Sequence, residues 1–133
     1  METKELHVGI TGCAETVVDE HNTAEAVGSG ILKVFATPMM IALMEKAACD
    51  SVAPFIGDDE GTVGITVNIT HESATPIGMK VYAKTELVEI DGRRLFFKTE
   101  AFDDAGLIGR GTHERFIIKN AKFQARTDSK GKN

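Results

Sequence analysis

Glu45 is the first residue whose position suggests chemistry. The sequence predicts a helix over residues 37–52, in which Lys46 and Asp50 lie within about 40° of each other and form the polar stripe. Glu45 lies about 100° from Lys46, among apolar residues. A carboxylate on an apolar face is costly to bury unpaired. Glu45 therefore either has a partner, has a raised pKa, or lies where this edge of the helix reaches solvent.

His71 is the second candidate. Apolar and polar residues alternate from Val63 to Ile69, which predicts a strand with every second residue on one apolar face. Extending this alternation by one step places His71 at the end of that face, directed toward the core or toward a cleft. A histidine there is either a hydrogen-bonded structural residue or a base. Together with an inward carboxylate, it forms the minimal acid/base pair.

Thr37 is the third candidate and begins the predicted helix. It suits the N-cap position, and Pro38 suits the first helical position, where its missing N–H costs nothing. As the N-cap, the Thr37 hydroxyl would bond a backbone N–H. It would also lie beside the positive end of the helix dipole, where a developing oxyanion is stabilised.

These three residues belong to elements that predict an α+β fold. The interior of the helix is rich in Ala, Leu and Met, and its apolar residues cover most of its circumference, which indicates a buried helix. Asp91-Gly92 is a strong hairpin signal between two strands. The predicted strands cover residues 6–10, 15–18, 63–69, 79–90, 93–102 and 107–118. One long central helix wrapped by a curved antiparallel sheet is the expected architecture.

Composition limits the classes of partner. The chain has 133 residues, which favours one domain, and 42% of them are hydrophobic, which is enough for a core. Residues 1–120 carry 11 basic and 19 acidic side chains, a net charge of -8, whereas the last 13 residues carry four basic and one acidic, a net charge of +3. An acidic body argues against nucleic-acid binding. We expect one domain over residues 1–123 and a basic, disordered tail over 124–133.

The expected cellular location and cofactor requirement are inferred from sequence motifs that we do not find. No apolar segment is long enough to span a bilayer, and the charged N-terminus does not resemble a signal peptide. Cys13 and Cys49 are too few for a disulfide framework, which favours free thiols and a cytoplasmic location without membrane partners. The histidines and cysteines lack zinc-site spacing, and the glycines of residues 27–30 match no nucleotide-binding loop. We therefore expect neither a metal nor a cofactor.

Several short motifs together point to a known family. They occur in the same order and at compatible spacing as in hotdog-fold thioesterases of the fluoroacetyl-CoA thioesterase type, which this sequence resembles from about Val34 to Phe123. The motifs are Val34-Phe-Ala-Thr-Pro38, Met44-Glu45, Thr70-His-Glu-Ser-Ala-Thr-Pro76, Asp91-Gly-Arg-Arg94 and Gly109-Arg-Gly-Thr-His-Glu-Arg-Phe116. The resemblance implies the hotdog fold, in which an antiparallel sheet wraps one long helix.

The resemblance also implies hydrolysis of a small acyl-CoA thioester at a site on a dimer interface. The family's catalytic threonine, glutamate and histidine match Thr37, Glu45 and His71. The glycine that approaches the substrate matches Gly64, and the arginine associated with substrate contact matches Arg115. We expect His71 to be the general acid/base and Glu45 its partner, a nucleophile or an activator of water. Thr37 would be a nucleophile or an oxyanion stabiliser.

One departure from the family concerns selectivity. The fluoroacetyl-specific member carries phenylalanines just before the first motif, whereas Gly28–Ile31 is glycine-rich and contains no aromatic residue. We therefore expect a short acyl-CoA substrate without fluoroacetyl specificity. A non-catalytic acyl-CoA-binding module and a hydratase of the same fold are the alternatives. A homodimer or a higher homo-oligomer is also expected, because pairing two protomers covers the exposed edges of a curled sheet.

Overall fold

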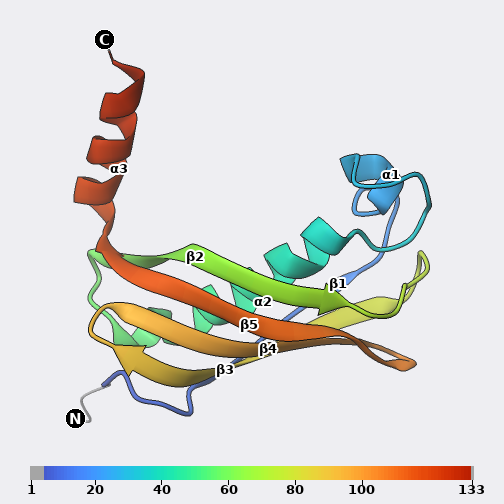
Figure 1. The fold of residues 1–133 in the computed structure, drawn as a ribbon, viewed down its shortest axis with the longest axis horizontal. Helices are drawn as coiled ribbons and strands as arrows, with labels where there is room; N and C mark the ends of the chain where they lie inside the picture. The colour runs from blue at the N-terminus through green and yellow to red at the C-terminus, as the bar shows by residue number, and fades with distance from the viewer. Residues whose placement is uncertain (1–4, 133) are drawn as a thin grey trace.

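The computed structural model describes residues 5–132, which form one curved antiparallel sheet with a long helix along one face (Figure 1). The strands lie in the order β1-β3-β4-β5-β2. Their bounds are β1 Thr11–Val17, β2 Glu60–His71, β3 Lys80–Asp91, β4 Arg94–Asp103 and β5 Gly106–Lys119, and the helices are α1 Ala24–Val27, α2 Thr37–Val52 and α3 Asn120–Asp128. Single 3-10 turns cover Ala53–Phe55 and Ser129–Gly131. The predicted α+β architecture is confirmed.

Helix α2 has the predicted bounds but a different cap. Ala36 is the N-cap, and its carbonyl accepts hydrogen bonds from the backbone N–H groups of Met39 and Met40, both at 3.0 Å. Thr37 is therefore the first helical residue, and the prediction that its hydroxyl caps the helix is wrong. The physical reason is that this hydroxyl bonds another side chain, which leaves Ala36 to start the helix without a side-chain cap.

The core lies between α2 and the concave face of the sheet. The helix buries one stripe, made of Met40, Leu43, Met44, Ala47, Ala48 and Val52. Small residues face it, and a Cβ added at Gly12 of β1 would collide with the Ala47 carbonyl oxygen, so the strand needs glycine there. The stripe that contains Ala42 and Lys46 is exposed, so the helix is buried on one side rather than all round.

Strand β2 forms one edge of the sheet, and in the part of the chain that the structure describes it pairs with β5 alone. A bulge between Gly64 and Thr66 shifts its register, so that Gly64 lies opposite Arg115 and Val67 opposite His113. Because paired residues share a face, the bulge places Gly64 rather than Val63 on the same face as His71. The uninterrupted alternation predicted from Val63 is therefore wrong, and Gly64 to Asn68 are all exposed.

The remaining strands match the sequence pattern with two differences. Asp91-Gly92 forms the predicted β3–β4 hairpin, in which Gly92 has a φ of 60°. The expected strand over residues 6–10 is absent from the described chain, and β1 instead begins at Thr11 and pairs with β3.

The C-terminal residues also differ from the expected disordered tail, because α3 extends through residue 128. It is rich in good helix formers, and Gln124 Nε2 donates to Asp128 Oδ1 at 2.9 Å one turn later. The helix projects away from the sheet beyond the β2–β5 edge (Figure 1). None of the helices within residues 5–132 has the length and apolar character needed to cross a membrane.

Candidate functional site

Thr37 and His71 are in direct contact. The Thr37 Oγ1 atom lies 2.7 Å from His71 Nδ1, so the first residue of α2 is hydrogen-bonded to the last residue of β2. Both residues line a cavity of about 240 Å³, which also includes Phe35 and residues of the loop after β2. A hydroxyl held against an imidazole nitrogen in a cavity is the arrangement of a nucleophile and its base.

The loop after β2 holds these two residues in place. Thr75 is fully buried, and its hydroxyl donates to Asp103 Oδ2 at 2.7 Å. Its carbonyl oxygen accepts a hydrogen bond from the backbone N–H of Phe35 at 2.9 Å, and Val34 forms a bridge with Pro76. The segment that leads into Thr37 is therefore fixed to the segment that follows His71. Two of the sequence motifs, far apart along the chain, form one framework.

The environment of His71 favours its neutral form. Burial lowers its pKa below the usual histidine value of 6.5, and the nearby backbone of Ser73 opposes this in part. The Nε2 atom is buried and has no hydrogen-bond partner among the residues that the structure describes. A buried imidazole nitrogen without a partner costs free energy, so a hydrogen bond to Nε2 would stabilise the site.

Glu45 lies in a second cluster, on the same face of the sheet. Its Oε2 atom is 3.6 Å from Arg115 Nη1, and its side chain is 41% exposed, whereas that of Arg115 is 7% exposed. A Cβ added at Gly64 would lie 2.6 Å from Glu45 Oε2. The glycine thus leaves the space in which the carboxylate rests.

Arg115 is held from several sides. Its Nε donates to Thr62 Oγ1 at 2.8 Å, and its Nη2 donates to the Thr62 carbonyl oxygen at 2.9 Å. Its Nη1 lies 3.1 Å from His113 Nε2. The arginine is thereby fixed by its own chain, and its expected contact with substrate stays a prediction.

The structure therefore brings the five predicted site residues together in two groups rather than one. Thr37 and His71 form the first group, and Glu45, Gly64 and Arg115 form the second. Eight residues of α2 separate Thr37 from Glu45, an advance of about 12 Å. Seven residues of β2 separate Gly64 from His71, about 23 Å for an extended strand. The expected Glu45–His71 pair is thus not formed within the described chain.

Replacing Gly64 by alanine is expected to lower the turnover number about tenfold or more while the protein stays folded. The new Cβ would push against Glu45 Oε2 and lie 3.2 Å from His113 Cε1. Because the family resemblance predicts a catalytic role for Glu45, its displacement is expected to lower the rate. Steady-state kinetics with thermal unfolding checks this. Gly57→Ala is the control, since its Cβ would press on Asp59 Oδ1 at 3.0 Å, outside both groups. Equal turnover of Gly64→Ala and wild type would contradict the expectation.

Sequence reasoning missed Thr62 and His113 as members of the second group. The available signal was the alternation of β5, in which His113, Arg115 and Ile117 are all buried. Two buried polar residues two positions apart on one strand face must find hydrogen-bond partners. The partner strand supplies them through Thr62 and Thr66.

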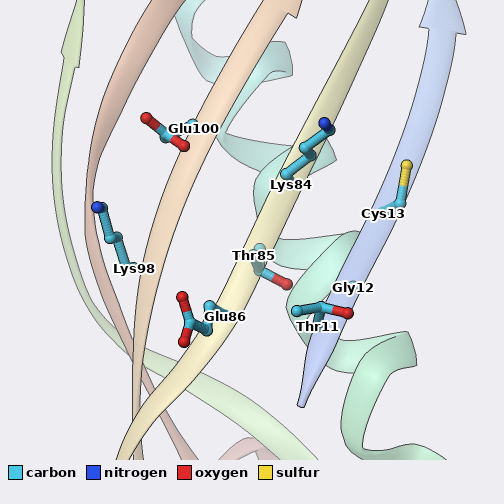
Figure 2. Close-up of a pocket in the computed structure, with 8 residues that line it drawn as sticks. All are labelled: Thr11, Gly12, Cys13, Lys84, Thr85, Glu86, Lys98 and Glu100. Carbon is cyan, nitrogen blue, oxygen red and sulfur yellow. The ribbon is translucent and has the colours of Figure 1, made fainter. Parts of the chain in front are cut away.

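A larger depression, of about 510 Å³, lies on the face of the sheet away from α2. Figure 2 shows that charged side chains of β3 and β4 and the thiol of Cys13 surround it. It contains none of the predicted site residues, and its acidic and basic groups are mixed. The cavity at Thr37 and His71 is therefore the candidate site. Within residues 5–132, no group of three or more histidine, cysteine or acidic side chains has metal-binding geometry.

Comparison with known proteins identifies the family. The family described as "Fluoroacetyl-CoA-specific thioesterase" matches residues 18–121. The fluoroacetyl-CoA thioesterase of Streptantibioticus cattleyicolor is 42% identical over 98 residues, which are 74% of this chain and 70% of that protein. This chain belongs to the fluoroacetyl-CoA-specific thioesterase family. The resemblance seen in the sequence motifs is confirmed, and the chain is a thioesterase by family.

Solved structures agree with this membership. A structure of the fluoroacetyl-CoA thioesterase superposes with a TM-score of 0.88 at 36% identity, over 94% of this chain and 97% of that chain. A hypothetical protein of Thermus thermophilus, described as a thioesterase superfamily member, superposes with a TM-score of 0.86 at 29% identity, over 95% of this chain and 93% of that chain. The hotdog fold implied by the resemblance is confirmed.

Proposed function

We propose that this protein hydrolyses a small acyl-CoA thioester to the free acid and CoA. The observation that carries the proposal is the 2.7 Å contact between Thr37 Oγ1 and His71 Nδ1 in a cavity, in a chain of this family. A threonine variant of the fluoroacetyl-CoA thioesterase has been solved with acetyl-CoA, and it superposes with a TM-score of 0.89 at 35% identity. A short acyl-CoA is therefore the substrate class to test.

In the proposed mechanism Thr37 is the nucleophile and His71 the base. Neutral His71 accepts the hydroxyl proton at Nδ1 while Thr37 Oγ1 bonds to the thioester carbon. The carbon–sulfur bond then breaks, and the CoA thiolate takes the proton from the imidazolium. Water, deprotonated by His71, attacks the acyl-threonine ester, and the threonine oxygen leaves with that proton. The positive end of α2 stabilises the oxyanion in both steps.

We propose that Glu45 of a partner subunit completes this site. Neutral His71 that accepts a proton at Nδ1 carries its own proton on Nε2, the buried atom without a partner. Two β2 edges that pair antiparallel around a two-fold axis between Val67 and Asn68 place Gly64 of one chain opposite His71 of the other. Because Glu45 rests on Gly64, the partner's Glu45 then lies beside His71, and a shift of the residues that cover Nε2 lets the two groups bond.

The exposure of β2 supports such a homodimer. Within residues 5–132 no strand pairs with its outer side, and Ile65 and Val67, in the middle of the proposed pairing, are 43% and 42% exposed. Covering an apolar edge strand removes unpaired backbone groups and apolar surface from water. Sedimentation at micromolar concentration is expected to give a dimer or a higher oligomer, and a monomer would contradict the proposal.

The substrate is proposed to be a short acyl-CoA without fluoroacetyl selectivity. The segment beside the cavity contributes Ala24 and Ser29 to its lining, and Gly28–Ile31 contains no aromatic side chain that could close over an acyl group. Specificity constants for acetyl-CoA and fluoroacetyl-CoA are expected to lie within about tenfold of each other, a difference of about 1.4 kcal/mol in transition-state binding. A much larger preference for fluoroacetyl-CoA would contradict this part of the proposal.

The direct test is a panel of acyl-CoA thioesters of increasing chain length, assayed by release of free thiol. Thiol release with multiple turnovers supports hydrolysis. Tight binding of acyl-CoA without thiol release would instead indicate a binding module, and water addition to an enoyl-CoA with the thioester intact would indicate a hydratase. Mass spectrometry of the quenched enzyme tests for the acyl-threonine, which direct attack by water would not produce.

The pH dependence of the Glu45→Gln variant provides a separate check. In the wild-type dimer, the partner's Glu45 carboxylate raises the pKa of His71. The variant lacks this carboxylate, so burial dominates and keeps the pKa of His71 below 6.5. Activity needs neutral His71 and is lost as the pH falls through this pKa. The acid limb of kcat/KM, measured between about pH 5 and 8, is therefore expected at lower pH in the variant. An unmoved limb would contradict the partner assignment.

We also propose a cytoplasmic location. Cys13 and Cys49 are both free, as expected in a reducing compartment. Recovery of the protein in a secreted fraction would contradict this.

A further inference from the structure

We propose that His113 is a positioning residue for the catalytic carboxylate, because as a neutral imidazole in one tautomer it fixes Arg115, which in turn holds Glu45. The inference rests on the proposed function, since it assigns a role relative to Glu45 in thioester hydrolysis. His113 itself is 2% exposed and does not line the cavity at Thr37 and His71.

The tautomer follows from the two neighbours of the ring. His113 Nδ1 lies 2.8 Å from the Thr66 carbonyl oxygen, which can only accept, so Nδ1 carries the proton. His113 Nε2 lies 3.1 Å from Arg115 Nη1, which can only donate, so Nε2 is the acceptor. Only the neutral ring with its proton on Nδ1 satisfies both bonds. A second proton would point at the guanidinium.

The chain of contacts ends at the carboxylate. Thr62 binds Arg115 through two hydrogen bonds on the side of Nε and Nη2, and His113 fixes Nη1. The same Nη1 atom lies 3.6 Å from Glu45 Oε2. The guanidinium plane is thereby set by three hydrogen bonds. Its fourth contact is an ion pair with Glu45, the carboxylate proposed to serve the partner subunit's His71.

The charges around the ring also keep it neutral. Burial is the largest influence and lowers the pKa of His113 below 6.5. The Thr66 carbonyl raises it, Arg115 lowers it, and the carboxylates of Glu45 from α2 and Glu114 from β5 raise it by smaller amounts. The neighbouring ring from β4, Phe97, is uncharged and lies with its centroid 6.2 Å from that of His113.

Three variants separate positioning from simple packing. His113→Phe removes the hydrogen-bond acceptor for Arg115. If the Phe variant does not fold, His113→Met removes the same acceptor with a more flexible side chain. His113→Gln restores an acceptor near the position of Nε2. We expect kcat to fall about 10- to 100-fold in the Phe or Met variant with KM within about threefold, and to recover to within about fivefold of wild type in Gln. Thr99→Val is the matched control, since it removes a buried hydrogen bond to Met44 outside the network and should leave kcat unchanged.

Two further readouts do not depend on packing. In the Glu45→Gln background, His113→Phe should lower kcat by less than about twofold, because both changes then act on the same group. Nitrogen-15 NMR of the wild-type histidines should show His113 protonated on Nδ1 alone at pH 7. Unchanged kcat in His113→Phe, failure of Gln to restore it, or a proton on Nε2 would each overturn the inference. Absence of thiol release by the wild-type enzyme would instead reject the proposed function.

Discussion

Replacing His71 by alanine is expected to reduce kcat/KM for thioester hydrolysis by about 10²- to 10⁴-fold, the contribution typical of a positioned general base. The variant loses the group that takes the Thr37 proton, while Thr37, the helix terminus and the cavity framework stay in place. Because His71 is half-buried with one unpaired nitrogen, its removal should not unfold the protein. Thiol release measured on protein with a wild-type thermal transition checks the result.

The control for this prediction is His21→Ala, which removes a histidine whose side chain is 83% exposed and lies outside the cavity at Thr37 and His71. Its kinetics should match wild type. Thr37→Ala should resemble His71→Ala, and Thr37→Ser should keep much of the activity, because the hydroxyl is retained. Hydrolysis at the wild-type rate by His71→Ala would remove the basis for the proposed site.

Mixing two inactive variants is expected to restore activity. A heterodimer of one Glu45→Gln chain and one His71→Ala chain contains one site in which an intact His71 meets an intact Glu45 of the partner subunit. The other site lacks both residues. A purified heterodimer should therefore have about half of the wild-type activity per dimer, although each homodimer is nearly inactive. Co-expression with two different affinity tags provides the sample.

A heterodimer that regains no activity would contradict the proposed pairing. If Glu45 and His71 of the same chain acted together, each site of the heterodimer would lack one of them, and its activity would stay at the level of the homodimers. The matched control is a heterodimer of two differently tagged His71→Ala chains, which should remain inactive in either case. The comparison tests the two-fold pairing of β2 edges without a crystal of the complex.

Much of the fold could be predicted because local patterns act over short distances. The helix from Thr37 to Val52 has the predicted bounds, because strong helix formers and Pro38 act within a few turns. The Asp91-Gly92 hairpin forms where turn chemistry placed it, since Gly92 adopts a positive φ. Residues 124–128 of the expected tail are helical, because α3 is rich in residues that favour a helix.

The sequence by itself determined the residue types of the site and the family to which they belong. Thr37, Glu45 and His71 each stood out from the local pattern, and the motifs around them match the family found by comparison. The contact between the Thr37 hydroxyl and the His71 imidazole is a finding of the structure, because the sequence led us to expect Glu45 as the partner of His71. The hydrogen-bond partner of the Thr37 hydroxyl could not be predicted from the sequence. The same hydroxyl can cap the helix or bond His71, and only the tertiary structure distinguishes the two.

Only the tertiary structure decided how these residues are grouped. The bulge in β2 places Gly64 on the face of His71, and the antiparallel course of the helix and the strand separates Glu45 from the histidine. In this arrangement Glu45 pairs with the buried Arg115, and His71 Nε2 has no partner within residues 5–132. A strand register and the packing of a helix across it depend on contacts between distant segments, which local spacing does not encode.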